Sequence, residues 1–475
     1  MYALKTQEGD IDLSQASKSF VAVALIVGLI VGVGIGWLAK PPEVPPEIRA
    51  QLQSLQSERD ALQTQLNATQ ASIDELKAAL IGVGPEAPIR TSITGEVKLG
   101  GLFSLSGALA SYGENEYTAA LLAAEHVNAF LKALGEGWTL TIVAEDTQTQ
   151  PSICLEKVES FAARGIKLLI GPLSSAEVRA IKGYCDANKM LAISQSSTAP
   201  DLAIAGDYIF RFCPSDKFGQ GPAIGRILYE DGKRYMIPVS RNDAWGVGLE
   251  EAAAKRFTEL GGTVLPGIRY SPDAKEFSAE AADLASKVQS AVAKYGADKV
   301  CVLHISFEEV NAFFTAASEY EVLSSVKWYG SDGTCAAGSM VEDPVVAEFA
   351  SKVGYPSTIF APTESAKWNM VRQNGIKVLG REPESYSYAV YDIVWAYALS
   401  ILKTNSTNPE VIREALPEVT QSFFGASGWI ELNEAGDRKA GDYVIWQIVK
   451  TDAGTYVWKV VGKYIMATDS VEWFG

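Results

Sequence analysis

Three stretches between residues 97 and 202 share one order of residue types, and that order suits the binding of a small charged molecule. Each runs from an apolar segment through a loop of small and hydroxyl residues into a helix-like pattern: VKLGGLFSLSGALASYG (97–113), KLLIGPLSSAEV (167–178) and LAISQSSTAPDL (191–202). If the apolar segments are parallel strands, the loops meet beyond the carboxyl ends of the sheet, where free N–H groups at helix N-termini favour anions. The loops therefore predict a pocket for a small anionic or zwitterionic molecule.

Other reactive residues give little support for catalysis or for a metal centre. The chain has two histidines, His126 and His304, and it lacks GxSxG, HExxH, GxxxxGK[ST] and strand-anchored GxGxxG motifs. A serine such as Ser175 has no evident base to activate it. We expect no enzymatic activity, no cofactor and no bound metal.

The five cysteines, at positions 154, 185, 213, 301 and 335, form no CxxC pair. Cys154 is expected near the start of one crossover helix and Cys185 near the end of the next. Because such helices run parallel, the two thiols would lie about 10 Å apart along the helix axis, beyond disulfide reach. We expect mostly buried free thiols and predict no disulfide.

The overall charge argues against a nucleic-acid partner. The formal net charge is -16 and the isoelectric point is near 4.8. A protein that binds nucleic acid needs a basic face to neutralise phosphates. The acidic balance is typical of a solvated surface.

Residues 20–39 form an uncharged apolar run between Lys18 and Lys40. About 20 such residues cross a hydrocarbon core of ~30 Å, so the run is a membrane span or a signal sequence. The partly acidic leader (1–19) and the lack of an A-x-A site favour an uncleaved anchor. Whether the leader is processed is left open.

A proline-rich break and a heptad pattern follow the anchor, over residues 40–80. Spacings of four and three alternate without a slip through Ile48, Leu52, Leu55, Arg59, Leu62, Leu66, Thr69, Ile73, Leu76 and Leu80. The pattern predicts a coiled-coil stalk of roughly 50 Å that could form a homo-oligomer through residues 48–80. The alternative is a single amphipathic helix that leans on the globular region. A linker (81–95) comes next.

From Val97 onward, strand and helix patterns alternate. Strands are expected at 97–103, 138–144, 167–171, 190–194, 234–239, 263–268, 299–304 and 326–330. This alternation predicts an α/β fold in which parallel sheets carry helices on both faces. A division near residues 210–216 separates two doubly wound lobes. We expect the first lobe at about 96–212 and 355–425, and the second at about 213–354 and 426–475.

Nine sequence blocks in this region resemble the leucine/isoleucine/valine-binding family of type I solute receptors. They are LSGALASYGENEYTAALLAAEHVNA, AEDTQTQP, IGPLSSAEV, ISQSSTAPDL, YIFRFCPSD, SRNDAWGVGL, KEFSAE, WYGSDG and GWIELNEAGDRKAGDYVIWQIV, in that order across roughly 380 residues. The resemblance implies two lobes that are joined by three crossings and close around a ligand. It also implies an extracytoplasmic location and an ABC permease as partner.

In this family, hydroxyl and main-chain N–H groups of the first lobe hold the ligand's carboxylate. The matching positions are Ser175 in GPLSSAE and Ser196 and Thr198 in SQSSTAP, with Ser174 as a possible addition. Tyr112 in ASYG matches the aromatic residue that covers the ligand. The plain alternative is that the hydroxyls cap helices and that the tyrosine packs within its lobe.

On the second lobe, Trp245 in DAWG matches an aromatic residue that faces the cleft, and Asp332 in GSDG matches the acidic residue that pairs with the ligand's ammonium. A further aromatic position is ambiguous between Ser306 and Phe307. His304 could reshape the side-chain pocket, although a buried core histidine with satisfied hydrogen bonds is the more common arrangement.

These residues favour one function over two others. The resemblance implies a solute-binding protein of an ABC importer that binds a branched-chain type of amino acid, or a related small amide or zwitterion, outside the cell and next to the membrane. A ligand-sensing receptor ectodomain and a surface assembly protein are the alternatives.

Overall fold

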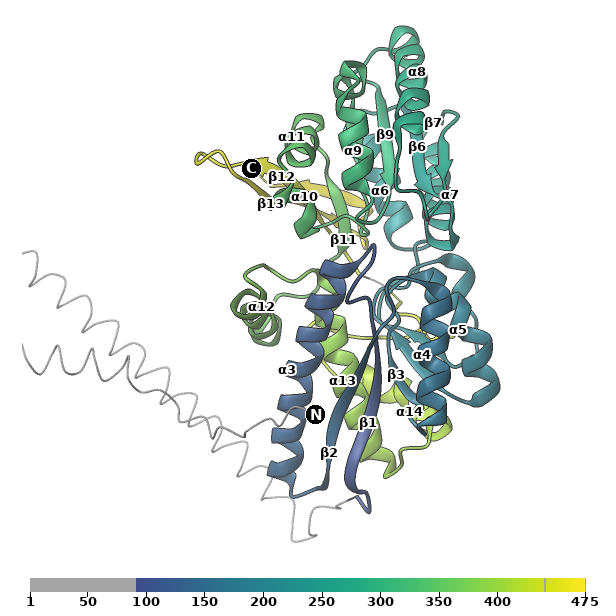
Figure 1. The fold of residues 1–475 in the computed structure, drawn as a ribbon, viewed down its shortest axis with the longest axis vertical. Coiled ribbons are helices and arrows are strands. Elements are labelled where there is room, and N and C mark those ends of the chain that lie inside the picture. The colour runs from purple at the N-terminus through teal and green to yellow at the C-terminus, as the bar shows by residue number, and fades with distance from the viewer. Residues whose placement is uncertain (1–90, 440, 475) are drawn as a thin grey trace, which may run out of the picture. The chain divides into compact units, whose positions relative to one another are not determined.

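The first lobe is built on a parallel sheet. The structure is a computed structural model that describes residues 91–439 and 441–474. Five strands pair in parallel in the order β2-β1-β3-β4-β5 (Figure 1). Strands β3 and β4 are mainly apolar and buried along their whole length, as expected for strands covered on both faces. The bounds are β1 (Thr94–Phe103), β2 (Gly137–Asp146), β3 (Leu168–Ile170), β4 (Leu191–Ser194) and β5 (Ile209–Arg211).

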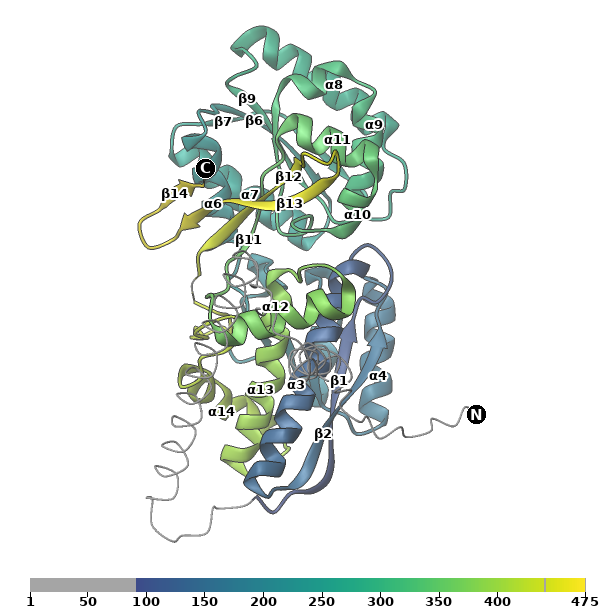
Figure 2. The ribbon, with the colours of Figure 1, turned by 90° about the vertical axis from the view of Figure 1, so that its left-hand side faces the viewer.

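Helices cover both faces of this first sheet. On one face, α4 (Pro151–Ala163) and α5 (Ser175–Asn188) pack on Leu102, Leu169 and Ala192. The other face is covered by α3 (Ala110–Leu134), α13 (Ser385–Thr404) and α14 (Pro409–Gln421). Helix α12 (Ala366–Leu379) lies beside α3 and α13 (Figure 2). The predicted α/β architecture with parallel sheets is confirmed.

A second parallel sheet forms the second lobe, in the order β10-β9-β6-β7, with β8 beside β6. The expected strand at 263–268 is two short strands, because Pro266 lacks an N–H donor and ends the first one. The strands are β6 (Tyr235–Arg241), β7 (Thr263–Val264), β8 (Ile268–Tyr270), β9 (Val300–Ile305) and β10 (Lys327–Tyr329). The helices are α6 (Gln220–Glu230), α7 (Ala244–Glu259), α8 (Ser278–Tyr295), α9 (Val310–Ser318), α10 (Gly338–Glu342) and α11 (Pro344–Val353), and the 3₁₀ turns are η1 (Pro200–Leu202) and η2 (Glu321–Ser325).

An antiparallel sheet that the sequence did not predict completes the second lobe. Its order is β11-β12-β13-β14, with bounds Ser357–Phe360, Tyr443–Lys450, Tyr456–Ile465 and Ser470–Trp473. Ile359 and Ile445 of this sheet belong to the hydrophobic core of the second lobe, whereas Ala426 and Ile430 pack in the core of the first. The chain therefore changes lobes after Phe360, not near residue 354, and returns beyond residue 430, not at 426.

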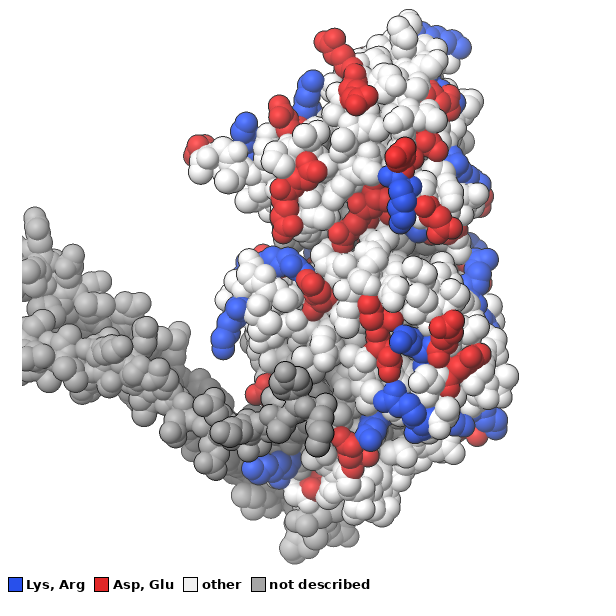
Figure 3. Space-filling view, in the orientation of Figure 1, with Lys and Arg blue, Asp and Glu red and all other residues white. Residues whose placement is uncertain are grey.

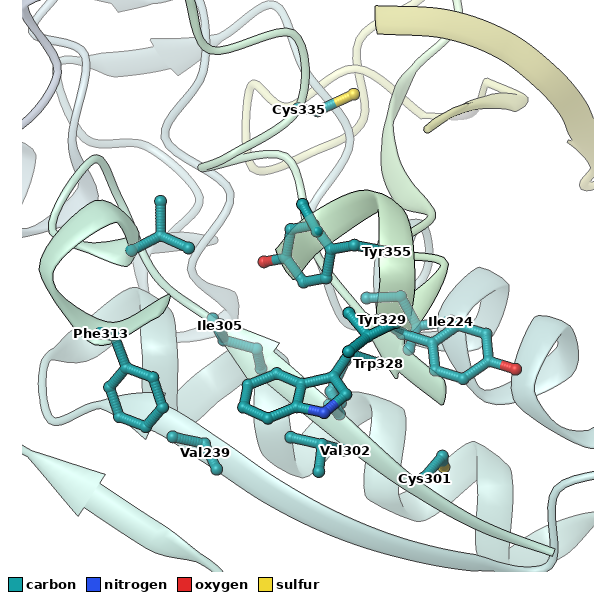
Figure 4. Packing of buried hydrophobic residues seen from close by; sticks show 14 of the residues in the cluster. Ile224, Val239, Cys301, Val302, Ile305, Phe313, Trp328, Tyr329, Cys335 and Tyr355 are labelled. Carbon is teal, nitrogen blue, oxygen red and sulfur yellow. The ribbon is translucent and has the colours of Figure 1, made fainter. Parts of the chain in front are cut away.

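Aromatic rings fill the core of the second lobe (Figure 4). Trp328 is fully buried, meets Phe314 edge-on with ring centroids 5.5 Å apart, and donates its indole N–H to Leu323 O at 2.8 Å. All five cysteines are buried with free thiols, in agreement with the expectation.

The first and third crossings between the lobes are tied together where they leave the first lobe. Arg211 and Asp437 form a buried two-point ion pair, with both nitrogen–oxygen distances 2.5 Å. Backbone hydrogen bonds run beside the pair, from Arg211 N to Gly436 O (3.0 Å) and from Arg438 N to Arg211 O (2.9 Å). Two chain segments that are more than 200 residues apart in the sequence thus leave the first lobe from one fixed point.

Acidic and basic side chains are interspersed over the face drawn in Figure 3, in keeping with the expected solvated surface. None of the helices in residues 91–439 and 441–474 is long and apolar enough to cross a membrane. The predicted leader (1–19), membrane span (20–39) and stalk (40–80) lie outside the described residues.

Candidate functional site

A small cavity lies between the two lobes, and about 290 Å³ in and around it, including space open to solvent, is free of protein atoms. Five of the six residues expected at the site line it, and so do two of the four considered possible. The lining residues from the first lobe are Leu109, Tyr112, Leu173, Ser174, Ser175, Ser196 and Tyr386, and those from the second are Trp245, Phe307, Asp332 and Gly333.

Ser175 is the first residue of α5, and its hydroxyl has a proton to offer. The Oγ atom accepts hydrogen bonds from Ser197 Oγ (3.0 Å) and from Ala199 N (3.2 Å). Both acceptor sites of the hydroxyl are therefore used, so its proton is left to donate. Next to free N–H groups at a helix N-terminus, this donor suits a carboxylate.

The hydroxyls of Ser174 and Ser196 are already engaged, although both residues line the cavity. Ser174 caps α5: its Oγ donates to Glu177 Oε2 (2.6 Å) and accepts from Glu177 N (3.3 Å) in a capping box. Ser196 Oγ donates to Leu173 O at 2.8 Å. These two residues shape the loops, and Ser175 supplies the donor.

Thr198 does not line the cavity, which corrects the expectation for this residue. Its hydroxyl turns away and donates to Asp216 Oδ2 at 2.8 Å, while Asp216 N donates to Thr198 O at 2.9 Å. The threonine therefore joins the ligand loop to the first crossing. Asp216 was not expected at this site. It follows a strand whose loop lacks the run of hydroxyl residues that marked the other loops.

An aromatic stack forms the second lobe's wall of the cavity. Trp245 and Phe307 are stacked with ring centroids 4.6 Å apart at 18°, and the guanidinium of Arg241 lies 4.0 Å from the Phe307 centroid. Phe307 is thus the further aromatic residue of the site. Ser306 is buried with its hydroxyl donated to Phe307 O (3.0 Å) and does not line the cavity.

His304 lies in the aromatic core of the second lobe and not at the cavity, so the idea that it reshapes the pocket is wrong. Its ring centroid is 4.6 Å from that of Phe313 and 5.6 Å from that of Phe314. Neither ring nitrogen has a hydrogen-bond partner among the described residues, so the expected satisfied histidine is not found either. Burial lowers the pKa of His304 to about 3.

Asp332 brings an acceptor into the cavity. Its Oδ2 accepts a hydrogen bond from Tyr386 OH (2.6 Å), whereas Oδ1 has no partner within the described parts of the chain. Burial raises the pKa of this carboxyl to about 6, against the opposing effect of the Tyr386 hydrogen bond. A donor from a ligand would satisfy Oδ1 and favour the ionised form.

Direct hydrogen bonds already join the lobes around the cavity. Tyr112 OH lies 2.6 Å from Asp332 O and 2.5 Å from Cys335 O, and it donates across the cleft. Ser111 Oγ donates to Glu308 Oε1 (2.6 Å) in the same way. The conformation is therefore closed, and Tyr112 both covers the cavity and holds the lobes together.

Tyr386, Leu109, Leu173 and Gly333 are lining residues that sequence reasoning missed. Three of them are neighbours of residues that were identified, so they share the same loops. Tyr386 is the second residue of α13, far along the chain from the other lining residues of its lobe. Only the return of the chain to the first lobe brings it to the cavity.

Comparison with known proteins agrees with this fold. Residues 115–451 match the family model described as the receptor family ligand binding region. The uncharacterized protein MJ1266 of Methanocaldococcus jannaschii is 33% identical over 395 residues, which cover 79% of this chain and 91% of that protein. A leucine-, isoleucine-, valine-, threonine- and alanine-binding protein of Pseudomonas aeruginosa is 24% identical over 357 residues, which cover 74% and 90%.

A solved structure shares the fold as well. The crystal structure of a leucine-binding protein from Thermotoga maritima has a TM-score of 0.65 at 20% identity, and the match covers 77% of this chain and 98% of that one. The matched family is a ligand-binding family, the Pseudomonas aeruginosa relative is named as a binding protein, and this chain is likewise a binding protein and not an enzyme. The chain belongs to the leucine/isoleucine/valine-binding family of type I periplasmic solute-binding proteins, within the receptor family ligand binding region.

Proposed function

We propose that this protein binds a small zwitterionic amino acid, of the branched-chain type or a related amide, between its lobes and delivers it to an ABC permease. The observation that carries the proposal is that the two lobes bring different polar groups to the cavity. Ser175, whose hydroxyl proton is left to donate, lines it from one lobe, and Asp332, whose Oδ1 has no partner among the described residues, lines it from the other. A ligand with a carboxylate and an ammonium group can satisfy both ends only when the lobes are closed.

The walls between these two ends suit an apolar side chain. Leu109, Leu173, Trp245 and Phe307 line the cavity and offer apolar contact, with little conformational entropy to lose at the two aromatic residues. Ligand binding would therefore favour closure through contacts that the open form cannot make. A permease that docks on the closed form would receive a loaded protein.

Calorimetric titration of the full chain tests this function. L-leucine, L-isoleucine and L-valine come first, followed by the other free amino acids, their amides and short peptides. We expect saturable binding of at least one apolar amino acid. If no member of the panel binds, the proposal fails.

Asp332→Asn tests the ammonium contact. The exchange keeps the shape of the side chain but removes the charge, and a hydrogen bond to a charged group contributes about 1.5–3 kcal/mol, so affinity should fall by roughly 10- to 150-fold. Asp392→Asn is the matched control, because Asp392 is equally buried and its pKa is also raised to about 6, yet it bonds Ser427 inside the first lobe. That variant should lose thermal stability and keep its affinity.

The proposal places the binding domain outside the cell and next to the membrane, held by residues 20–39 with a stalk over residues 48–80. The apolar run and the heptad pattern support this arrangement. Full-length protein should remain with the membrane fraction after a high-salt wash, and deletion of residues 20–39 should release it. Release of the intact chain by salt alone would contradict the anchor.

A further inference from the structure

Three buried acceptor atoms around the first crossing have no donor. Asp332 Oδ1, Asp216 Oδ1 and Gln220 Oε1 lack a hydrogen-bond partner within residues 91–439 and 441–474, and none of the three residues is more than 4% exposed. Gln220 donates an amide N–H to Thr358 O (2.7 Å), and a hydrogen bond from its side chain is among the causes that favour the charged form of Asp332. A buried acceptor without a donor is costly, and this group needs at least one more proton.

Within the part of the chain that the structure describes, Asp216 and Asp332 also lack a cation that is not already paired. Arg211 is the basic group that acts on Asp216, but its guanidinium is already engaged: Nε and Nη2 pair with Asp437, and Nη1 donates to Ser197 O and Ala199 O. The other titratable groups around the pair are neutral or acidic: Tyr112, Tyr386 and Tyr443, the thiols of Cys213 and Cys335, and Glu384. Two buried carboxylates that share a site without a counter-ion do not both ionise.

The surroundings decide which carboxyl keeps the proton. Asp332 accepts from Tyr386 OH, and backbone N–H groups at Asp332 and Gly333 further favour its charged form. Asp216 has one donor to its side chain, the Thr198 hydroxyl. Burial and the neighbouring Asp332 raise the pKa of Asp216 well above its usual range. The proton therefore belongs on Asp216.

We propose that Asp216 is a neutral carboxylic acid in the folded protein, so that the cleft presents the ligand with the single negative charge of Asp332. This inference rests on the proposed function for its consequence: the ligand carries one ammonium group at that end and no second cationic group beside it. Asp216 does not line the cavity, and its one side-chain hydrogen bond comes from Thr198, which does not line the cavity either. If the carboxyl of Asp216 were ionised as well, the cleft would instead suit a ligand with two positive charges.

Infrared spectroscopy of the ligand-free full chain near neutral pH tests the proton itself. A neutral carboxylic acid has a carbonyl stretch that a carboxylate lacks. Other buried carboxyls contribute similar bands, so the measurement is the difference between native protein and Asp216→Asn. We expect an acid band that is lost in this variant and retained in Asp332→Asn. Equal acid bands in native protein and Asp216→Asn would overturn the proposal.

Titration with L-leucine at pH 7 tests the charge count. Asp216→Asn removes no charge if the acid is neutral, so affinity should change by no more than about threefold, whereas Asp332→Asn should lose about tenfold or more. Similar losses in the two variants, with both still folded by thermal melting, would mean that both carboxyls are ionised. Absence of L-leucine binding in native protein would count against the proposed function and leave the infrared result to decide this inference.

Discussion

The hydroxyl of Tyr112 should control closure of the lobes more than the stability of the fold. In the closed form it donates to two carbonyl oxygens of the second lobe, Asp332 O and Cys335 O, from a side chain that is 2% exposed. Tyr112→Phe keeps the ring that covers the cavity and removes only this donor. In the open form water can bond to both carbonyls, so the loss of the tyrosine hydrogen bonds destabilises mainly the closed form.

The size of the effect follows from those contacts. A buried acceptor that loses its donor costs about 1–3 kcal/mol. Because ligand binding requires closure, this penalty appears as weaker apparent affinity, by about 5- to 150-fold. The melting temperature of the ligand-free protein should change little, since neither lobe loses an internal contact.

Tyr397→Phe provides a matched control. Tyr397 OH makes the same two-carbonyl arrangement, with Leu169 O at 2.8 Å and Leu191 O at 3.0 Å, but wholly within the first lobe. We expect this variant to melt earlier and to bind L-leucine, or whichever panel amino acid binds native protein, with unchanged affinity. Calorimetric titration and differential scanning calorimetry give the affinity and the melting temperature of each of the two variants.

The reasoning is refuted if Tyr112→Phe binds as tightly as native protein. It is also refuted if the two variants lose the same amounts of affinity and of stability. Small-angle scattering of ligand-free Tyr112→Phe offers an independent check, because a shift towards the open form increases the radius of gyration.

Three further predictions concern other buried groups. His304 has a pKa of about 3 in the folded protein against an ordinary 6.5, so between these pH values the unfolded chain binds a proton that the folded protein does not. The free energy of unfolding should therefore fall by about 1.4 kcal/mol for each pH unit below 6.5. Urea unfolding of His304→Phe should show a shallower fall. Burial and the nearby carboxyls raise the pKa of Glu116, so the folded state binds more protons and stability drops as pH rises above about 4.5; Glu116→Gln should raise the melting temperature at pH 8 more than at pH 5. A Cβ on Gly333 would lie 2.6 Å from the Trp245 ring and 2.5 Å from Ser306 O. Gly333→Ala should therefore change tryptophan fluorescence and weaken the free energy of ligand binding by about 1–3 kcal/mol. Unaltered affinity would mean that the ring can move freely.

The sequence predicted the parallel sheets because their strands are short apolar runs between helix-like segments. The antiparallel sheet was not predicted. In its strands β12 and β13 the alternation of burial is interrupted partway along, so neither strand shows one unbroken two-residue pattern. The lobe boundary at 354 failed for a related reason, since β11 joins the second lobe by pairing with β12, a strand more than 80 residues later. Such long-range pairing leaves no local signal.

Within the site, residue type predicted position better than it predicted bonding. Ser174, Ser175 and Ser196 all reached the cavity, yet only Ser175 keeps a proton to donate, because the partners of the other two are decided by capping and loop packing. Thr198 sits in the predicted loop and points to the first crossing. Hydroxyl direction depends on rotamers and neighbours that a single sequence does not reveal.

The tie between Arg211 and Asp437 has a mechanical consequence. Since both crossings are clamped where they leave the first lobe, neither can bend at that point, and flexing is confined to the few residues beyond it. On the first crossing, Asp216 N is still bonded to Thr198 O, so the segments left to bend are 217–219 before α6 and 441–442 before β12. So short a pivot acts as the fulcrum of a lever whose long arm is the second lobe: a small backbone rotation there sweeps the rim of the cleft through a much larger arc.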